Sequence, residues 1–130
     1  MKPIDKARLA AKCFDDKKAG NIIALEIGEL TGIADYFLIG SAGSSAQVKA
    51  IADEIEEKMA EAGFKPLHVE GYNSAAWVLL DYGDVVCHVF HSETRGFYGI
   101  ERLWSDAKKL EGEALLGGEA LNKEDGEKSL

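Results

Sequence analysis

The sequence of 130 residues contains only two cysteines and two prolines, and it has no long hydrophobic run. Two cysteines, Cys13 and Cys87, are too few for a disulfide scaffold and suit reduced thiols in a core. No stretch approaches the roughly 18 apolar residues that a membrane helix needs. The N-terminal residues lack an apolar signal core, and their acidic residues argue against a mitochondrial or plastid presequence. We therefore expect a cytoplasmic protein without a membrane segment.

Basic residues are also scarce, because 15 Lys and Arg stand against 23 Asp and Glu and leave a formal net charge of −8. A chain of this charge repels phosphate backbones on average, so no direct nucleic-acid binding is expected. The negative charge instead favours attraction to a basic protein partner. The length and the 46% hydrophobic content are those of one globular domain with its own core.

Hydrophobic periodicity predicts the order helix, two strands, helix, three strands, helix. The clearest element is a helix that Ser44 caps, with Gln47 completing a capping box and Gly63 following its end. A last helix is expected from Glu93. Its buried side is marked by Phe97, Ile100, Leu103, Trp104 and Ala107.

The expected fold class is α+β (mixed α/β), with helices covering a mixed sheet of about five strands. Two of the strands form a hairpin, joined through the Asp/Gly turn at residues 81–84. The expected domain spans residues 1–110. Residues 111–130 are rich in Gly and Glu without a sustained period, and we expect a flexible acidic tail there.

A Cys and two His near the end of this hairpin invite a metal-site interpretation. On a strand, His88 points to one face, whereas Cys87 and His91 point to the other. Cys87 and His91 are four residues apart, or about 13 Å, whereas a zinc ion needs ligand atoms at about 2.0–2.3 Å. We therefore predict no metal site. The apolar surroundings of Cys87 likewise favour a packed thiol over a nucleophile.

The Ser/Gly turn at residues 41–45 follows a strand and precedes a helix, and such a loop can cradle a phosphate. The nucleotidyltransferase fold uses a turn of this kind, together with paired carboxylates that hold Mg²⁺. The following strand carries only Glu70. The sequence thus predicts a scaffold of this kind without catalytic carboxylates, without a cofactor and without enzyme activity.

The hairpin leaves one candidate surface. Trp77, Leu79 and Asp81 share a strand face, and the opposite face carries Ala76, Val78 and Leu80, which suit the core. An aromatic side chain beside carboxylates is the usual composition of a protein-binding hot spot. The alternative is that helices cover both faces and Trp77 belongs to the core.

The sequence from about Lys17 to Leu110 closely resembles the ribosomal silencing factor (Iojap-like) family. The resemblance rests on ordered motifs: Ala34-Asp35-Tyr36-Phe37, Glu70-Gly71, Trp77-Val78-Leu79-Leu80-Asp81, His88-Val89-Phe90, and Arg95 with Tyr98, Glu101 and Trp104.

The resemblance implies a non-enzymatic fold related to nucleotidyltransferases. It also implies binding to ribosomal protein fourteen of the large ribosomal subunit, which would block joining of the small subunit and repress translation when nutrients are short. A role in large-subunit assembly and a homodimer are further possibilities that the family raises. A nucleotide-binding enzyme using the Ser/Gly turn is a weaker alternative. The candidate partner-binding residues are Trp77, Asp81, Glu70, Tyr82, Asp84, Arg95 and Tyr98.

Overall fold

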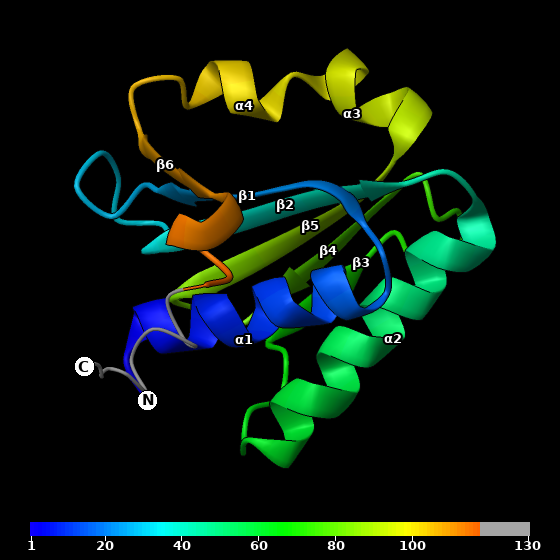
Figure 1. Ribbon diagram of the computed structural model, residues 1–130, viewed down its shortest axis with the longest axis horizontal. Helices are drawn as coiled ribbons and strands as arrows, with labels where there is room; N and C mark the ends of the chain where they lie inside the picture. Colours follow the sequence, from blue (N-terminus) through cyan, green and yellow to red (C-terminus); the bar gives the residue numbers. More distant parts are fainter. Residues whose placement is uncertain (118–130) are drawn as a thin grey trace.

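The computed structural model describes residues 1–117, apart from the side chain of Phe97, which lies outside the description. The helices are α1 (Pro3–Asp16), α2 (Ser45–Glu61), α3 (Ser92–Tyr98) and α4 (Ile100–Leu103), with a 3₁₀ turn η1 (Gly112–Ala114). The strands are β1 (Gly20–Glu26), β2 (Tyr36–Ala42), β3 (His68–Glu70), β4 (Trp77–Asp81), β5 (Val85–His91) and β6 (Lys108–Glu111). These elements form three layers, with α1 and α2 on one face of the sheet and α3 and α4 over the other (Figure 1). The expected mixed α+β class is confirmed.

The described strands form one sheet in the order β3-β4-β5-β2-β1-β6. The central pair, β2 and β5, is parallel, and every other neighbouring pair is antiparallel. The expected hairpin is present, since β4 and β5 pair around the turn at residues 82–84. The sheet has six strands rather than about five because β6 adds to the outer edge of β1.

Helix α2 forms as its sequence predicts. Ser44 is the N-cap, and its Oγ accepts a hydrogen bond from the backbone N–H of Gln47 at 3.1 Å. The apolar stripe of the helix faces the sheet, and the chain leaves the helix through Gly63 at φ +96°. The buried residues of this stripe are Val48, Ile51, Ala52, Ile55 and Met59.

The prediction of one last helix from Glu93 is wrong in its second half. Gly99 adopts a left-handed conformation that ends α3, and α4 then covers only Ile100–Leu103. Leu103, expected on the buried side, is 75% exposed. The chain next turns back and pairs β6 with β1, so that Leu110 packs toward the α1 and α2 side of the sheet.

The fold also continues past the boundary expected at residue 110. Glu111 ends β6, η1 follows, and Leu115 is fully buried in the core that α1 and α2 cover. An apolar side chain removed from water in this way stabilises the fold by roughly 1.5–3 kcal/mol. The expected tail therefore does not begin at residue 111, and its remaining residues, 118–130, lie outside the described part.

Two apolar clusters fill the two faces of the sheet. The larger lies between the sheet and helices α1 and α2 and includes Val78, Leu80 and Cys87. The smaller lies on the other face and includes Phe37, Phe90 and Ile100, with Trp77 and Leu79 packed at its border. Within residues 1–117, no helix is long and apolar enough to cross a bilayer.

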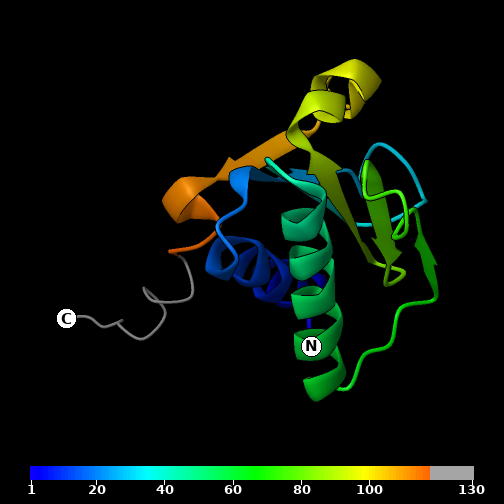
Figure 2. The same cartoon turned by 90° about the vertical axis from the view of Figure 1, so that its right-hand side faces the viewer.

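Helices α3 and α4 do not extend over the whole of the second face. Helix α3 packs on β5 and β2. Figure 2 shows these helices at the top of the sheet, while β3 and β4 continue down the right-hand side with no described helix on their outer side. This part of the sheet is where the candidate residues of the hairpin meet solvent.

Candidate functional site

Strand β4 presents one buried side and one partly exposed side. Val78 and Leu80 have no exposed surface, whereas Trp77, Leu79 and Asp81 are all partly exposed. The strand alternation predicts these two sides correctly for Val78 and Leu80, whereas Ala76, which precedes β4, is partly exposed. Trp77 falls between the two interpretations of the sequence, since it packs against the smaller cluster and still reaches solvent.

Three aromatic side chains surround the inner part of the Trp77 ring. The indole stacks on Phe90, with ring centroids 5.0 Å apart, and contacts the ring of Tyr98 at 4.7 Å. Its Nε1–H donates a hydrogen bond to Nδ1 of His88 at 3.1 Å. Phe90 lies directly opposite Trp77 in the β4–β5 register. These contacts hold a large ring at the border of the covered region.

The backbone before Trp77 is also constrained. Gly71 has φ +83°, and a Cβ at this position would lie 2.1 Å from the carbonyl oxygen of Trp77. Thr94 at the start of α3 donates its hydroxyl to the carbonyl of Ala76 at 2.6 Å. The loop between β3 and β4 therefore needs glycine at position 71, and α3 fixes the start of β4.

Two carboxylates share the face of the sheet on which Trp77 and Leu79 lie. Glu70 of β3 pairs with Leu79, and Asp81 pairs with His68. The Nε2 atom of His68 contacts Oε2 of Glu70, and both side chains are exposed. We call the side chains of Glu70, Trp77, Leu79, Asp81 and Tyr98 the β4 surface.

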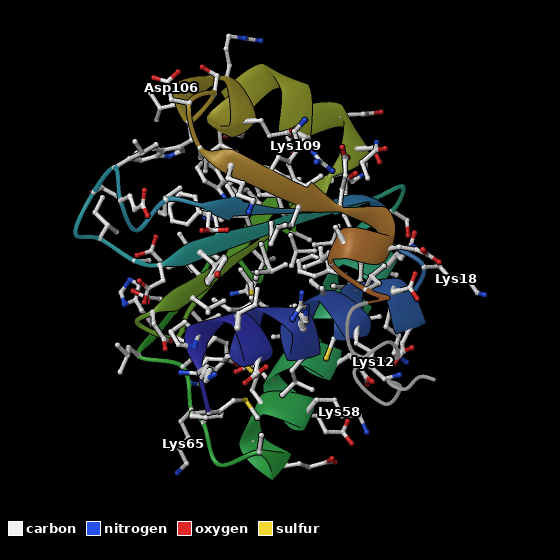
Figure 3. The ribbon with its side chains drawn as sticks, turned by 60° about the vertical axis from the view of Figure 1, so that its left-hand side comes forward. Lys12, Lys18, Lys58, Lys65, Asp106 and Lys109 are labelled. Atoms are coloured by element: carbon white, nitrogen blue, oxygen red, sulfur yellow. The ribbon has the colours of Figure 1, made fainter. Side chains whose placement is uncertain are left out.

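Four of the five residues of the β4 surface, all except Tyr98, lie in a part of the chain without lysine or arginine. Residues 67–91 contain no Lys or Arg. Lysines elsewhere lie in other regions: Figure 3 labels Lys12, Lys18, Lys58 and Lys65 in the layer of α1 and α2, and Lys109 on β6 at the far edge of the sheet. The carboxylates beside Trp77 thus face solvent without a neighbouring Lys or Arg on their own strands.

Two of the candidate residues lie on the other side of the sheet. Tyr82 is only 6% exposed, and burial in the larger cluster raises the pKa of its hydroxyl. Asp84 forms an ion pair with Nζ of Lys6 in α1 at 2.8 Å. The twist of the turn carries both side chains toward α1, and neither belongs to the β4 surface.

Arg95 is buried and makes its hydrogen bonds within the domain. It is 9% exposed, and its Nε donates to Oε2 of Glu101 at 2.6 Å. Its Nη1 donates to the carbonyl of Gly20 and to Oγ of Ser41, each at 3.3 Å. Arg95 therefore links α3 and α4 to β1 and β2, whereas Tyr98, three residues on, is 49% exposed beside Trp77.

Cys87 and His88 of β5 point to opposite faces, as the strand alternation predicts. Cys87 belongs to the larger cluster, where burial raises the pKa of its thiol, and His88 contacts the aromatic rings of the other face. Burial also raises the pKa of Cys13, to about 12. Among the described residues, no three His, Cys, Asp or Glu side chains are grouped so that they could hold a metal ion.

The Ser/Gly turn before α2 uses its polar groups internally. Ser44 caps the helix, and the backbone N–H of Gly43 donates to Oε1 of Gln47 at 3.3 Å. The Nε2 of Gln47 in turn donates to the carbonyls of Lys17 and Lys18 at 3.2 and 3.1 Å. A phosphate would have to displace these contacts, so the turn favours a helix entry over a nucleotide site.

A hollow of about 450 Å³ lies away from the β4 surface. It is formed by the start of α1, the end of β1 and the loop to β2, and Glu26, Glu29 and Asp35 contribute to its lining. Lys2, Pro3, Ile4, Gly28 and Tyr36 complete the lining, so none of its residues belongs to the β4 surface.

The sequence interpretation missed two neighbours of Trp77. Strand alternation puts His88 and Phe90 on one face of β5, but it does not reveal their contacts with Trp77. The register supplies the missing signal, because a hairpin that turns at residues 82–84 places residue 90 opposite residue 77. Counting pairs back from the turn would have found Phe90 and, beside it on the same face, His88.

A family model described as "Ribosomal silencing factor during starvation" matches residues 1–129. A protein named ribosomal silencing factor RsfS from Halalkalibacterium halodurans is 45% identical over 109 residues, which cover 84% of this chain and 93% of the relative. One of the same name from Bacillus subtilis is 47% identical over 100 residues, 77% of this chain and 85% of the relative. A crystal structure of a Chromobacterium violaceum protein, 37% identical, matches with a TM-score of 0.79 over 81% of this chain and 88% of that one.

Proposed function

The chain belongs to the ribosomal silencing factor family, and from this we propose that it binds ribosomal protein fourteen of the large subunit through the β4 surface. Bound there, the domain blocks joining of the small subunit and represses translation in the cytoplasm when nutrients are short. The single observation that carries the choice of surface is the partly exposed Trp77 on an uncovered strand, with Glu70 and Asp81 on the same face of the sheet.

The composition of the β4 surface supports a protein partner of basic character. Trp and Tyr are enriched at the energetic centres of interfaces, where a large ring removes much apolar area from water at small entropic cost. Glu70 and Asp81 lie on the same face of the sheet as the ring, and strands β3, β4 and β5 carry no Lys or Arg. A surface of this charge attracts a basic protein and repels the phosphates of ribosomal RNA.

The proposed mechanism is steric and needs no catalysis. A stable protein interface buries about 1,600 Å² in total, which a domain of this size supplies from one face. Any domain held on the surface where the subunits meet excludes the small subunit. The relatives are named as silencing factors, which is a regulatory role, and this agrees with a function without an enzyme reaction.

The proposal is tested with purified ribosomal subunits. We expect the protein to co-sediment with the large subunit and to slow formation of the joined ribosome, followed by light scattering. The Trp77→Ala variant should lose both effects together. A matched control is Tyr72→Ala, which truncates another aromatic side chain. The hydroxyl of Tyr72 donates a hydrogen bond to Asp53 of α2, in the layer on the opposite face of the sheet. Inhibition of joining by Trp77→Ala as strong as by the unmodified protein would rule out the β4 surface.

A further inference from the structure

One polar side chain is buried in the smaller apolar cluster beneath Trp77. His88 is 2% exposed, and the ring of Phe37 lies 4.6 Å from its own ring, edge on. Its Nδ1 accepts the hydrogen bond from Nε1 of Trp77. Its Nε2 is buried and has no hydrogen-bond partner among the described residues.

These contacts define the state of the imidazole. Because Nδ1 accepts a hydrogen bond, the neutral ring carries its own hydrogen on Nε2, and that N–H is the group left without a partner. An unpaired buried donor costs about 1–3 kcal/mol, and an apolar side chain of similar size would avoid this cost. Burial also lowers the pKa of His88 to about 4, so the ring is neutral near pH 7. The stability of the core therefore does not explain a histidine at this position.

The hydrogen bond does have a consequence for the surface above it. Nε1 is the only polar atom of an indole side chain. With Nε1 directed inward to His88, the exposed part of the Trp77 ring consists of carbon atoms alone. Stacking on Phe90 alone allows the indole to turn over, whereas the bond to His88 selects one of the two orientations.

We propose that His88 is a positioning residue of the β4 surface: it holds the indole of Trp77 in one orientation and keeps the indole N–H out of the interface. The partner then meets an apolar aromatic surface, and the site that receives Trp77 is an apolar pocket without a hydrogen-bond acceptor for the ring. This inference rests on the proposed function for the identity of the partner. The orientation of the ring does not depend on that function.

Two variants of His88 separate positioning from packing. His88→Leu keeps nearly the volume and removes the acceptor, whereas His88→Asn places an oxygen acceptor near the position of Nδ1. The chain contains two Trp, so a ¹⁵N spectrum has two indole N–H resonances, and Trp77→Phe assigns them.

In His88→Leu we expect the Trp77 indole N–H to shift toward the solvent value and to exchange faster, while the melting temperature stays equal or rises. Affinity for the large subunit should fall about tenfold, the equivalent of 1.4 kcal/mol and near the net value of one hydrogen bond. His88→Asn should recover most of the affinity and the shift of the resonance. Trp77→Phe combined with His88→Leu should be no weaker than the weaker single variant, because both remove the same bond.

The inference is overturned if His88→Leu leaves the indole resonance and the affinity unchanged, or if the two substitutions are additive. If His88→Leu fails to fold, the indole resonance and the affinity of His88→Asn are compared with those of Trp77→Phe. Weaker binding of the large subunit by His88→Asn than by Trp77→Phe would then overturn the inference. Absence of any large-subunit binding by the unmodified protein contradicts the proposed function instead. In that case the indole resonances still decide whether His88 positions Trp77.

Discussion

Replacing Trp77 with alanine is expected to weaken ribosome binding far more than it weakens the fold. The ring has one partly exposed side and packs on Phe90 and Tyr98 with the other. Truncating a central aromatic residue of an interface costs about 2 kcal/mol or more, which corresponds to about a thirtyfold loss of affinity.

The cost to the fold is smaller than that of removing a core residue. A fully buried Trp→Ala change costs about 3–5 kcal/mol, and each aromatic pair adds about 0.5–1.5 kcal/mol to the area term. Because Trp77 is only partly buried, we expect about 2 kcal/mol. Domains of this size are stable by about 5–15 kcal/mol, so the variant remains folded.

The truncation also uncovers His88, which gives a local readout. The low pKa of His88 is caused by burial beneath its aromatic neighbours. In Trp77→Ala water reaches the imidazole, and the pKa should rise toward the ordinary value. The assays are thermal unfolding, titration of His88 by NMR, and sedimentation with the large subunit. A variant that is folded, shows the raised pKa and still binds with full affinity would refute the reasoning about the surface, whereas a variant that unfolds at 25 °C would place Trp77 in the core.

Three further changes test separate parts of the account. Gly71→Ala should lower the free energy of unfolding by more than 2 kcal/mol, roughly, because a Cβ would meet the Trp77 carbonyl, whereas Gly63→Ala, at a similar φ but with no atom within 4 Å, should cost only about 1 kcal/mol in the same thermal melts. Asp81→Lys should slow association with the large subunit more than Asp106→Lys, which makes an equal charge change on the exposed chain after α4. The difference between the two association rates should shrink as the salt concentration rises. Equal effects at all salt concentrations would mean that only the net charge of the protein matters. The pKa of His88 is about 4 in the folded protein and about 6.5 in the unfolded chain, so protonation favours the unfolded chain. The stability that depends on the neutral ring is complete above pH 6.5 and is lost as the pH falls to about 4. In urea titrations over this window, the free energy of unfolding of the wild type should therefore fall by roughly 3 kcal/mol more than that of His88→Leu.

The parts of the fold that local rules determine could be predicted from the sequence. The cap at Ser44, the glycine after α2 and the alternation along β4 each depend on a few neighbouring residues. The chain after Gly99 could not, because the apolar positions up to Leu110 suit a helix equally well. Pairing with β1, which is distant in sequence, overrides that local preference and forms β6.

The site was predictable only as far as one strand. Period-two alternation placed Trp77 and Asp81 together and placed Cys87 opposite His88. Tyr82 and Asp84 turned to the α1 side because the backbone leaves the strand geometry at the turn. The burial of Arg95 depends on Glu101, Ser41 and the Gly20 carbonyl, and only the folded chain brings these together.

We propose that the β4 surface binds a basic ribosomal protein and does not bind RNA. The most direct measurement is the affinity of the purified protein for isolated ribosomal protein fourteen and, separately, for naked large-subunit RNA across a salt series. We predict specific binding to the ribosomal protein, with association slowed by salt and lost in Trp77→Ala, and no appreciable binding to the RNA. Tight binding to the RNA without the protein, or binding to the protein that is indifferent to Trp77, would contradict the account.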